Sequence, residues 1–243
     1  MEATRLSEPQ RRGALVAGAM YLYTIVGSLL YMSWLRPMLV VPGDLEATAR
    51  NITVHPLLFR AGTTHEILMA LAIIPLAWGL YVLLRSTHAR LALLALCWRT
   101  AESILWALTG LVTLAAAQVV GADRASAFGV DQQVALLGVL LGANESALNV
   151  VILLTGLGSI IFFSLFLRSR LIARPLAIWG LVTYAVIIPF SCVKLVVPTL
   201  AALDMLIYTP GALFEIVIGG WLLYVASTSS PSSANARAGR RAW

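Results

Sequence analysis

The sequence predicts an all-α fold, a polytopic membrane helix bundle with six transmembrane helices. Of its 243 residues, 60% are hydrophobic and only 12% are charged, a balance that excludes a water-facing globule of this size. Apolar runs of about 20 residues, the length of a membrane-crossing helix, recur along the chain. They are continuous and far longer than the alternating segments of about 10 residues in a membrane β-barrel. The six runs lie at approximately residues 13–35, 57–84, 91–118, 143–167, 175–198 and 208–227.

The chain divides into one membrane domain and a tail. Residues 1–228 hold all six runs with short connections, so we expect a single six-helix transmembrane domain. The run at 13–35 has the basic flank of a signal peptide, but it is too long and lacks a clear cleavage site, so we expect it to be retained. Residues 229–243 are rich in Ser, Ala and Arg and predict a disordered, basic, cytoplasmic tail.

Arginines predict the orientation of the bundle. Segments separated by an even number of crossings lie on the same side of the membrane. Eleven of the sixteen arginines fall in segments on one side, and four fall on the other. Basic residues favour the cytoplasmic side, so both termini are expected to be cytoplasmic. The net charge of +6 then reflects topology and anionic lipid headgroups and requires no nucleic-acid partner. The eleven are Arg5, Arg11, Arg12, Arg85, Arg90, Arg168, Arg170, Arg174, Arg237, Arg240 and Arg241.

The connections on the outer side are the more elaborate ones. In the first, Pro42-Gly43-Asp44 forms a turn signal with Asp44 as an N-cap candidate, and residues 45–50 predict a short surface helix. Before the fourth run, residues 134–141 are apolar and are followed by Gly142. Two interpretations stay open here: an interfacial or re-entrant helix, or one long, tilted fourth helix.

Metal and disulfide chemistry have little support in the sequence. Cys97 and Cys192 lie inside apolar runs and are expected to act as small hydrophobic residues. The three histidines and two cysteines give no zinc, haem or iron–sulfur spacing. We therefore expect no cofactor and no metal, and the expected partners are membrane lipids and a lipophilic small molecule.

Ionisable residues inside the apolar runs mark the candidate site. A charge at membrane depth is costly unless it is paired, protonated or faces a water-filled cavity, so such residues indicate a functional site. Counted at 1.5 Å per residue, Arg99 and Glu102 fall close to the midplane and the others in the outer half, which predicts one outward-opening polar pocket. The residues are Glu66, Arg99, Glu102, Glu145, Lys194 and Glu215.

Four of these residues are the candidate catalytic set. Arg99 and Glu102 are three residues apart and share a helix face, which fits either a structural ion pair or a reactive one. If Glu66 also reaches Arg99, two carboxyls share one cation, and one of them keeps its proton and can act as a general acid while the other acts as the base. Glu215 is expected to be a pocket wall or a second acid.

The remaining candidates are assigned to substrate binding. Trp98 and Trp106 flank Glu102 by four residues and could wall an apolar pocket, although packing or lipid contact is the favoured explanation. Asn144 and Glu145 open the fourth run, and His65 points about 100° away from Glu66 on its helix. Lys194 is either a pocket residue or a lysine that snorkels to the interface, with Asp204 as its partner or as a cap of the sixth run.

Several short motifs occur in a fixed order along the chain: Arg11-Arg12-Gly13-Ala14, Pro42-Gly43-Asp44 with Asn51-Ile52, Leu58-Phe59-Arg60, Arg99-x-x-Glu102, and Phe214-Glu215 followed by Gly220-Trp221-Leu222-Leu223. Together they resemble a bacterial family of six-span membrane proteins known only as a domain of unknown function. The resemblance covers nearly the whole chain. It implies a multi-pass protein of the bacterial plasma membrane and supplies no activity. A looser likeness, in size and in buried acids, is to small multi-span membrane terpene cyclases, and it counts only as analogy.

These observations predict a membrane protein whose polar pocket binds a lipophilic small molecule. As an enzyme it would be a metal-independent general acid/base isomerase or cyclase, with Glu66 and Glu102 as acid and base and Arg99 as the charge partner. Two alternatives stay open: a proton-coupled transporter that uses the same carboxyls as a relay, and a noncatalytic membrane organiser whose charges fix helix packing.

Overall fold

The computed structural model describes residues 6–120 and 128–229, and the regular elements within these ranges are all helical. The predicted all-α class is confirmed, and five helical segments of the described chain are long and apolar enough to cross a membrane. In chain order the elements are α1 (Glu8–Leu30), the π-helical turn η1 (Tyr31–Leu35), α2 (Arg36–Leu39), α3 (Leu45–Val54), α4 (Pro56–Val119), α5 (Val130–Ser169), α6 (Arg174–Val196), the 3-10 turn η3 (Pro198–Leu203) and α7 (Asp204–Thr228).

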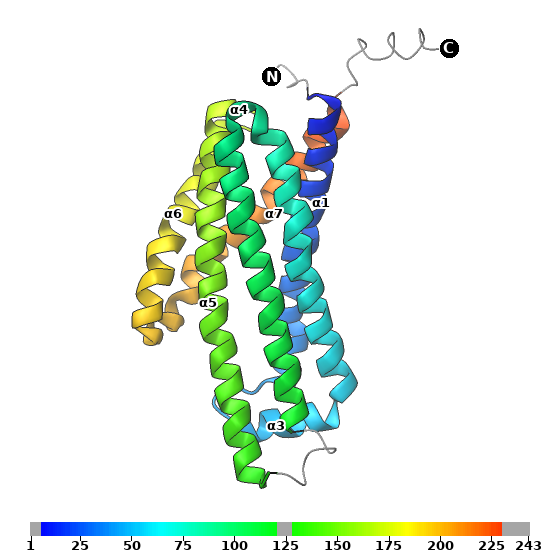
Figure 1. Cartoon of the computed structure of the whole chain (residues 1–243), viewed down its shortest axis with the longest axis vertical. Coiled ribbons are helices and arrows are strands. Elements are labelled where there is room, and N and C mark those ends of the chain that lie inside the picture. The colour runs from blue at the N-terminus through cyan, green and yellow to red at the C-terminus, as the bar shows by residue number, and fades with distance from the viewer. Residues whose placement is uncertain (1–5, 121–127, 230–243) are drawn as a thin grey trace, which may run out of the picture.

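Helix α4 is folded back on itself. His88 has the non-helical angles φ −161° and ψ 93°, and the segments before and after it run side by side in opposite directions (Figure 1). The Ser103 hydroxyl of the second arm donates a 2.7 Å hydrogen bond to the Ala70 carbonyl of the first. The two arms therefore coincide with the separate runs predicted at 57–84 and 91–118.

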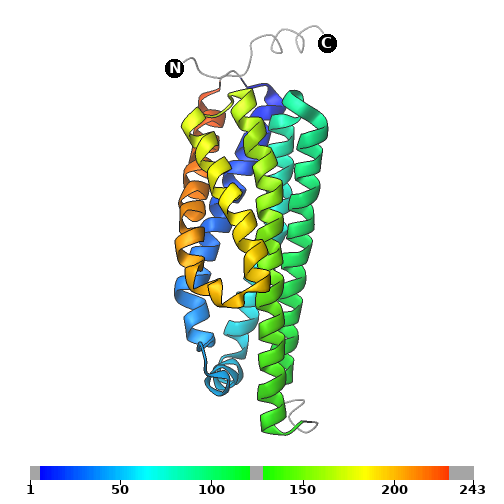
Figure 2. The same ribbon diagram turned by 90° about the vertical axis from the view of Figure 1, so that its left-hand side faces the viewer.

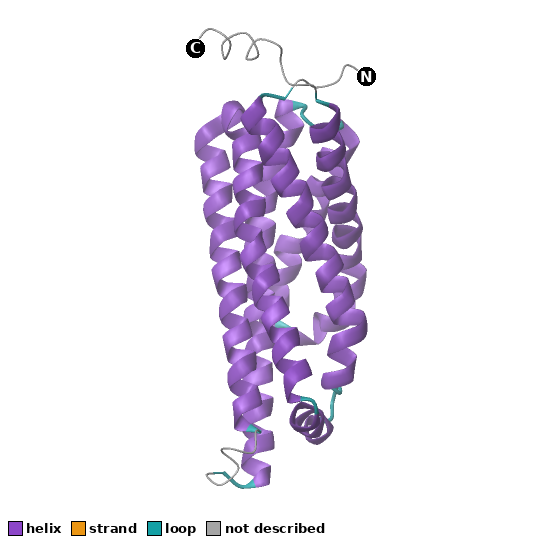
Figure 3. Ribbon diagram, turned by 90° about the vertical axis from the view of Figure 1, so that its right-hand side faces the viewer, coloured by secondary structure: helices purple, strands orange, loops and turns teal. Residues whose placement is uncertain are grey.

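The long helices form a closed ring. Helix α1 packs against α4 and α7, α4 packs against α5, and α6 joins α5 to α7. The start of α1, the bend of α4 and the end of α7 lie at one end of the bundle, called here the terminal end (Figures 1 and 3). The short helix α3 lies across the opposite end, called here the α3 end. A space enclosed by the ring is therefore bordered by segments distant in sequence.

Close contacts between small residues and aromatic rings hold the ring together. A Cβ added to Gly79 would lie 2.5 Å from the Gly13 carbonyl oxygen, so α1 and α4 touch where small residues allow it, as is common in membranes. Phe163 of α5 stacks on Tyr184 of α6 and meets Phe214 of α7 edge-on, with ring centroids 5.7 and 4.8 Å apart. Such ring pairs each add roughly 0.5–1.5 kcal/mol beyond their buried area.

The helices differ greatly in length. Helix α5 has 40 residues, about 60 Å at 1.5 Å per residue, whereas α6 has 23 residues, about 35 Å. The connection between α6 and α7 consequently lies well short of the α3 end (Figure 2). Residues 134–141 belong to the continuous α5. Of the two interpretations, the long fourth helix is therefore the one observed, and the re-entrant helix is wrong.

The predicted surface helix at residues 45–50 is confirmed and longer than expected. Helix α3 covers Leu45–Val54, and its N-cap Asp44 accepts a 2.8 Å hydrogen bond from the Ala47 amide. Ile52 of α3 is buried in a small apolar cluster at the α3 end, together with Phe59 and Leu137. Cys97 and Cys192 are both free. The predicted tail lies outside the described residues except for Ser229.

Candidate functional site

A cavity of about 260 Å³ lies inside the helix ring. It is bordered by α1, by both arms of α4, by α5 and by α7, and one wall includes a residue of η1. Most of its lining is apolar, yet four ionisable side chains project into it. The lining residues are Tyr21, Thr24, Ser28, Met32, Glu66, Ile73, Leu76, Arg99, Glu102, Trp106, Leu148, Val151, Ile152, Thr155 and Glu215.

Arg99 and Glu102 form an ion pair in the wall of this cavity. The Arg99 Nη1 lies 2.8 Å from the Glu102 Oε2, and the two side chains are 2% and 3% exposed. Arg99 also donates a 3.4 Å hydrogen bond to the Ser159 hydroxyl of α5. The aliphatic part of Arg99 lies against Gly158, where a Cβ would come within 2.8 Å of the Arg99 Cγ. The pairing predicted from the three-residue spacing is confirmed, and α5 helps to hold it.

Glu215 is the second carboxyl in the electrostatic environment of Arg99. Its Oε1 accepts a 3.0 Å hydrogen bond from the buried Tyr184 hydroxyl of α6. Arg99 interacts electrostatically with both Glu102 and Glu215. The Arg99 guanidinium on α4 thus interacts with carboxyls on two different helices, Glu102 on α4 and Glu215 on α7.

Glu66 lies apart from this group. Its polar neighbours are the Tyr31 hydroxyl, a hydrogen-bond partner, and Arg36. The Ser103–Ala70 hydrogen bond sets the register of the two α4 arms, and this register places Glu66 about eight residues, or about 12 Å, beyond Arg99 toward the α3 end. The condition that Glu66 reaches Arg99 is therefore not met, and Glu215 is the second carboxyl that Arg99 acts on.

Only one of the two candidate tryptophans reaches the cavity lining. Trp106 borders the cavity, whereas Trp98 does not, although both lie four residues from Glu102. Trp98 directly precedes the lining residue Arg99 and lies at nearly the same level, but its side chain leaves the helix about 100° away from that of Arg99. His65 is also outside the lining. Its ring meets that of Tyr23 edge-on at 6.2 Å between centroids, as expected for a histidine that packs between helices.

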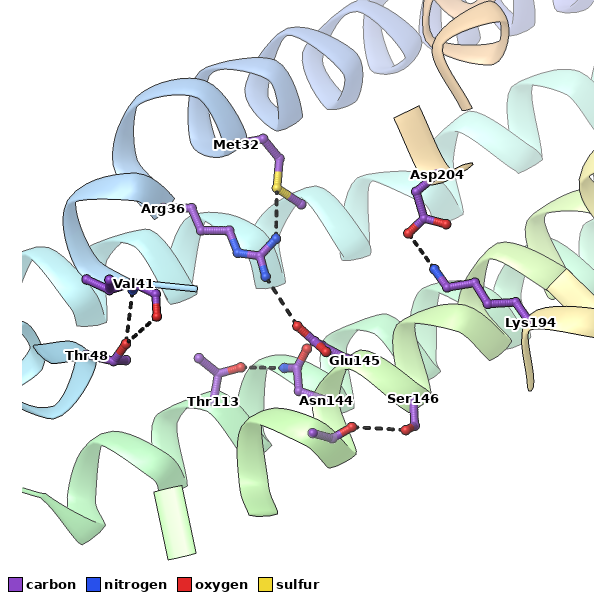
Figure 4. Close-up of polar contacts among 11 residues, drawn as sticks. Met32, Arg36, Val41, Thr48, Thr113, Asn144, Glu145, Ser146, Lys194 and Asp204 are labelled. Carbon is purple, nitrogen blue, oxygen red and sulfur yellow. Dashed lines mark hydrogen bonds and ion pairs between the residues drawn. The ribbon is translucent and has the colours of Figure 1, made fainter. Parts of the chain in front are cut away.

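Three further candidates are engaged in contacts in the half of the bundle nearer the α3 end (Figure 4). The Asn144 amide donates hydrogen bonds to the Thr113 hydroxyl at 2.6 Å and to the Thr109 carbonyl. Glu145 pairs with Arg36 at 3.7 Å, and Lys194 pairs with Asp204. Of the two roles predicted for Asp204, the pairing with Lys194 is confirmed. None of Asn144, Glu145 and Lys194 belongs to the cavity lining.

Sequence reasoning missed the polar residues that support the ionisable group. Tyr21, only 1% exposed, lines the cavity from α1, and Tyr184 and Ser159 contact Glu215 and Arg99 from neighbouring helices. Hydroxyl residues are common in membrane helices, so their positions alone carry no signal. Pairing them with Arg99 or Glu215 requires knowing which helices are adjacent.

The lining combines apolar side chains with groups that can form hydrogen bonds and carry charge. Carboxyls accept hydrogen bonds and exchange protons, and Arg99 stabilises negative charge. Among the described residues, no group of three or more His, Cys, Asp or Glu side chains is arranged to hold a metal ion.

Comparison with known proteins gives a family. A family model described as a domain of unknown function, DUF4386, matches residues 16–226, which is most of the chain. No curated protein matches the sequence. No solved structure matches it either.

Proposed function

We propose that this chain, which belongs to the DUF4386 family, binds a lipophilic small molecule in its central cavity. The observation that carries the proposal is the cavity itself, whose mostly apolar wall holds Glu66, Arg99, Glu102 and Glu215. Ligand sites of this kind are concave and largely apolar, with a few polar groups that fix orientation. A purely structural ion pair would not need an open space beside it.

The proposal includes a membrane with six crossings and both termini in the cytoplasm. The two arms of α4 cross separately, because each is longer than the roughly 20 residues that a bilayer requires. Basic residues flank the helix ends that meet at the terminal end: Arg11 in the first turns of α1, Arg85 and Arg90 about the bend of α4, Arg168 in the last turn of α5 and Arg174 at the start of α6. The preference of such residues for the cytoplasm supports placing the terminal end there.

The cavity extends from the middle of the bundle toward the α3 end. Glu215 and Arg99 lie at its inner part, and Met32 and Glu66 lie nearer to the α3 end. Four residues beyond Met32, Arg36 of α2 forms an ion pair with Glu145 of α5 (Figure 4). A ligand that enters from the outer side of the membrane passes this ion pair first. This arrangement supports an outward-opening pocket.

A lipophilic ligand fits both the size and the setting of the cavity. A volume of about 260 Å³ equals the liquid volume of roughly nine water molecules, so the ligand is smaller than a typical drug. Ile73, Leu76, Val151 and Ile152 supply apolar contacts to it. Each fully buried methylene of such a ligand contributes about 0.8 kcal/mol.

Native mass spectrometry of the detergent-purified protein tests the proposal. Ile73 and Ile74 are adjacent on α4, but only Ile73 lines the cavity, with 4% exposure against 38% for Ile74. We expect a discrete small-molecule adduct on the wild type and on Ile74→Phe, and loss of that adduct from Ile73→Phe. Bare protein in all three samples, or an adduct that Ile73→Phe leaves unchanged, would refute binding in the cavity.

Acid–base chemistry on the ligand is a second candidate function. It is favoured by Glu102 and Glu215, which share one guanidinium in a mostly apolar space. One carboxyl can act as the general acid and protonate the ligand, and the other can act as the general base and deprotonate it, so the net protonation of the site does not change. Incubation in deuterated water tests this: the bound lipophile should gain deuterium at carbon on the wild type, and no deuterium on Glu215→Gln.

A further inference from the structure

We propose that the ligand of the cavity is a lipophilic ammonium compound with an oxygen acceptor close to its nitrogen. This inference rests on the proposed function, because it assigns a chemical class to the molecule in the same cavity. Three features of the lining carry it: an excess of carboxyls, a pair of aromatic side chains, and one buried N–H group without a partner.

Carboxyls outnumber cations in the wall of the cavity. Glu66, Glu102 and Glu215 line it, against the single cation Arg99. Arg99 is committed to Glu102 by the 2.8 Å ion pair. Arg36 neighbours Glu66 but lies outside the lining. Glu215, held by the Tyr184 hydroxyl at 3.0 Å, feels Arg99 electrostatically but forms none of the ion pairs of the described chain, so a positively charged ligand group would complete the site.

Two aromatic side chains on the lining also suit a cation. Tyr21 of α1 and Trp106 of α4 both border the cavity. The faces of aromatic rings attract ammonium groups, most strongly where water is excluded, and quaternary ammonium ligands are commonly recognised in this way. An anionic ligand would meet the excess of carboxyls and be repelled.

A hydrogen-bond donor in the wall remains free. Arg99 is 2% exposed, and its Nε has no hydrogen-bond partner among the described residues. A buried donor without an acceptor is costly. Neighbouring atoms cover this Nε, but Arg99 lines the cavity, so a small shift of the guanidinium on binding would bring the N–H to an ester, ether or hydroxyl oxygen of the ligand.

Binding of hexanoylcholine to the full-length protein in neutral-lipid nanodiscs, measured by calorimetry against empty nanodiscs, tests the inference. The matched probe is the neutral dimethylbutyl ester of hexanoic acid, in which carbon replaces the quaternary nitrogen. We expect the cation to bind the wild type at least about tenfold more tightly than the neutral ester, a factor worth about 1.4 kcal/mol. Octyl sulfate is expected not to bind.

Variants then locate the charge effect. Glu215→Gln should remove most of the preference for the cation and leave the affinity for the neutral ester unchanged. Glu145→Gln is the control, because Glu145 is outside the lining and its side chain is 73% exposed. If Glu215→Gln does not fold, Ile73→Phe and Ile74→Phe decide whether the cation binds in the cavity, since only the former fills it.

The outcomes separate the two proposals. Equal affinity for the charged and the neutral ester, both abolished by Ile73→Phe, would overturn the ammonium inference and keep the lipophile pocket. Cation binding that neither Glu215→Gln nor Ile73→Phe reduces would be surface attraction and would overturn the inference. If no ester binds and the purified protein carries no adduct, both proposals fail.

Discussion

Arg99 and Glu102 form a 2.8 Å ion pair at the centre of the bundle, and each side chain is at most 3% exposed. The pair lies one helical turn apart on α4, and Gly158 and Ser159 of α5 contact Arg99 from the side. A buried ion pair adds little net stability compared with apolar residues, but loss of one partner leaves a buried charge. The pair is therefore a sensitive point for experiments on stability.

Arg99→Met should destabilise the protein strongly. It leaves Glu102 and Glu215 without their shared cation, and breaking a buried ion pair in this way typically costs about 3–5 kcal/mol. Glu102→Met should also destabilise, because Arg99 loses its nearest carboxyl. The measurement is the midpoint of thermal unfolding in a mild detergent, followed by gel filtration of the remaining folded protein.

The double variant Arg99→Met/Glu102→Met is the control for this prediction. It removes both charges together, so its unfolding midpoint should lie above that of either single variant. If the loss of stability in the double variant equals the sum of the losses in the two single variants, the two side chains do not act as a pair.

Gly158→Ala should weaken the support of the ion pair. The new Cβ would lie 2.8 and 2.9 Å from the Arg99 Cγ and Cδ and 3.3 Å from the Ala95 carbonyl oxygen. Overpacking of this kind costs about 1–3 kcal/mol, and Arg99 must shift away from Ser159. The same thermal measurement checks it.

Gly142 provides the matched control on the same helix. A Cβ at Gly142 meets nothing within 4 Å, so Gly142→Ala should be neutral or should stabilise by about 0.5–1 kcal/mol through helix propensity. If both alanine variants unfold alike, the close contact between Gly158 and Arg99 is unimportant.

Tyr184→Phe should weaken ligand binding more than it weakens the fold. The Tyr184 hydroxyl donates the 3.0 Å hydrogen bond to Glu215, and loss of one such bond to a charged group costs about 1.5–3 kcal/mol. Glu215 then loses its fixed position in the cavity wall, while the stacking of Tyr184 on Phe163 is kept. We expect folded protein with a reduced adduct in native mass spectra. An adduct as abundant as on the wild type would separate Glu215 from ligand binding.

Periodicity and spacing predicted the parts of the fold that depend on one helix at a time. The three-residue spacing of Arg99 and Glu102 sufficed to predict their pairing, because residues three apart share a helix face. The turn at Pro42-Gly43-Asp44 similarly predicted α3 and its cap. The long α5 left two interpretations open, since apolar residues 134–141 suit either a buried end of a helix or a surface segment.

Relationships between helices were beyond the sequence. Whether Glu66 or Glu215 approaches Arg99 depends on the register of the α4 arms and on the position of α7, and the apolar lipid-facing surfaces give no periodicity that fixes these rotations. The same reason explains why Trp98 and Trp106, symmetric about Glu102, could not be distinguished. The supporting hydroxyls of Tyr184 and Ser159 were missed because they lie on other helices.

The exposed ion pair between Arg36 and Glu145 should contribute far less to stability than the buried one. Its atoms are 3.7 Å apart, and the two side chains are 41% and 73% exposed. Exposed pairs contribute at most about 1 kcal/mol and are screened by salt. Glu145→Gln should therefore shift the unfolding midpoint little, and high salt should remove that small difference. A fall in the unfolding midpoint as large as that caused by Glu102→Met would show that this part of the bundle is more rigid than its exposure indicates.

Fusion proteins test the proposed orientation. The terminal end carries Arg11, Arg12, Arg85, Arg90, Arg168, Arg170 and Arg174 of the described chain. Since basic residues are retained in the cytoplasm, green fluorescent protein attached after Trp243 should fluoresce in a bacterial host. Alkaline phosphatase inserted at Gly129, between α4 and α5, should be active because that connection faces outward. A dark carboxy-terminal fusion together with an inactive insertion would reverse the orientation, and the cavity would then open toward the cytoplasm. A fluorescent fusion with an inactive insertion, or a dark fusion with an active insertion, would place Gly129 and the carboxy terminus on the same side, and α5, α6 and α7 would then not all span the membrane.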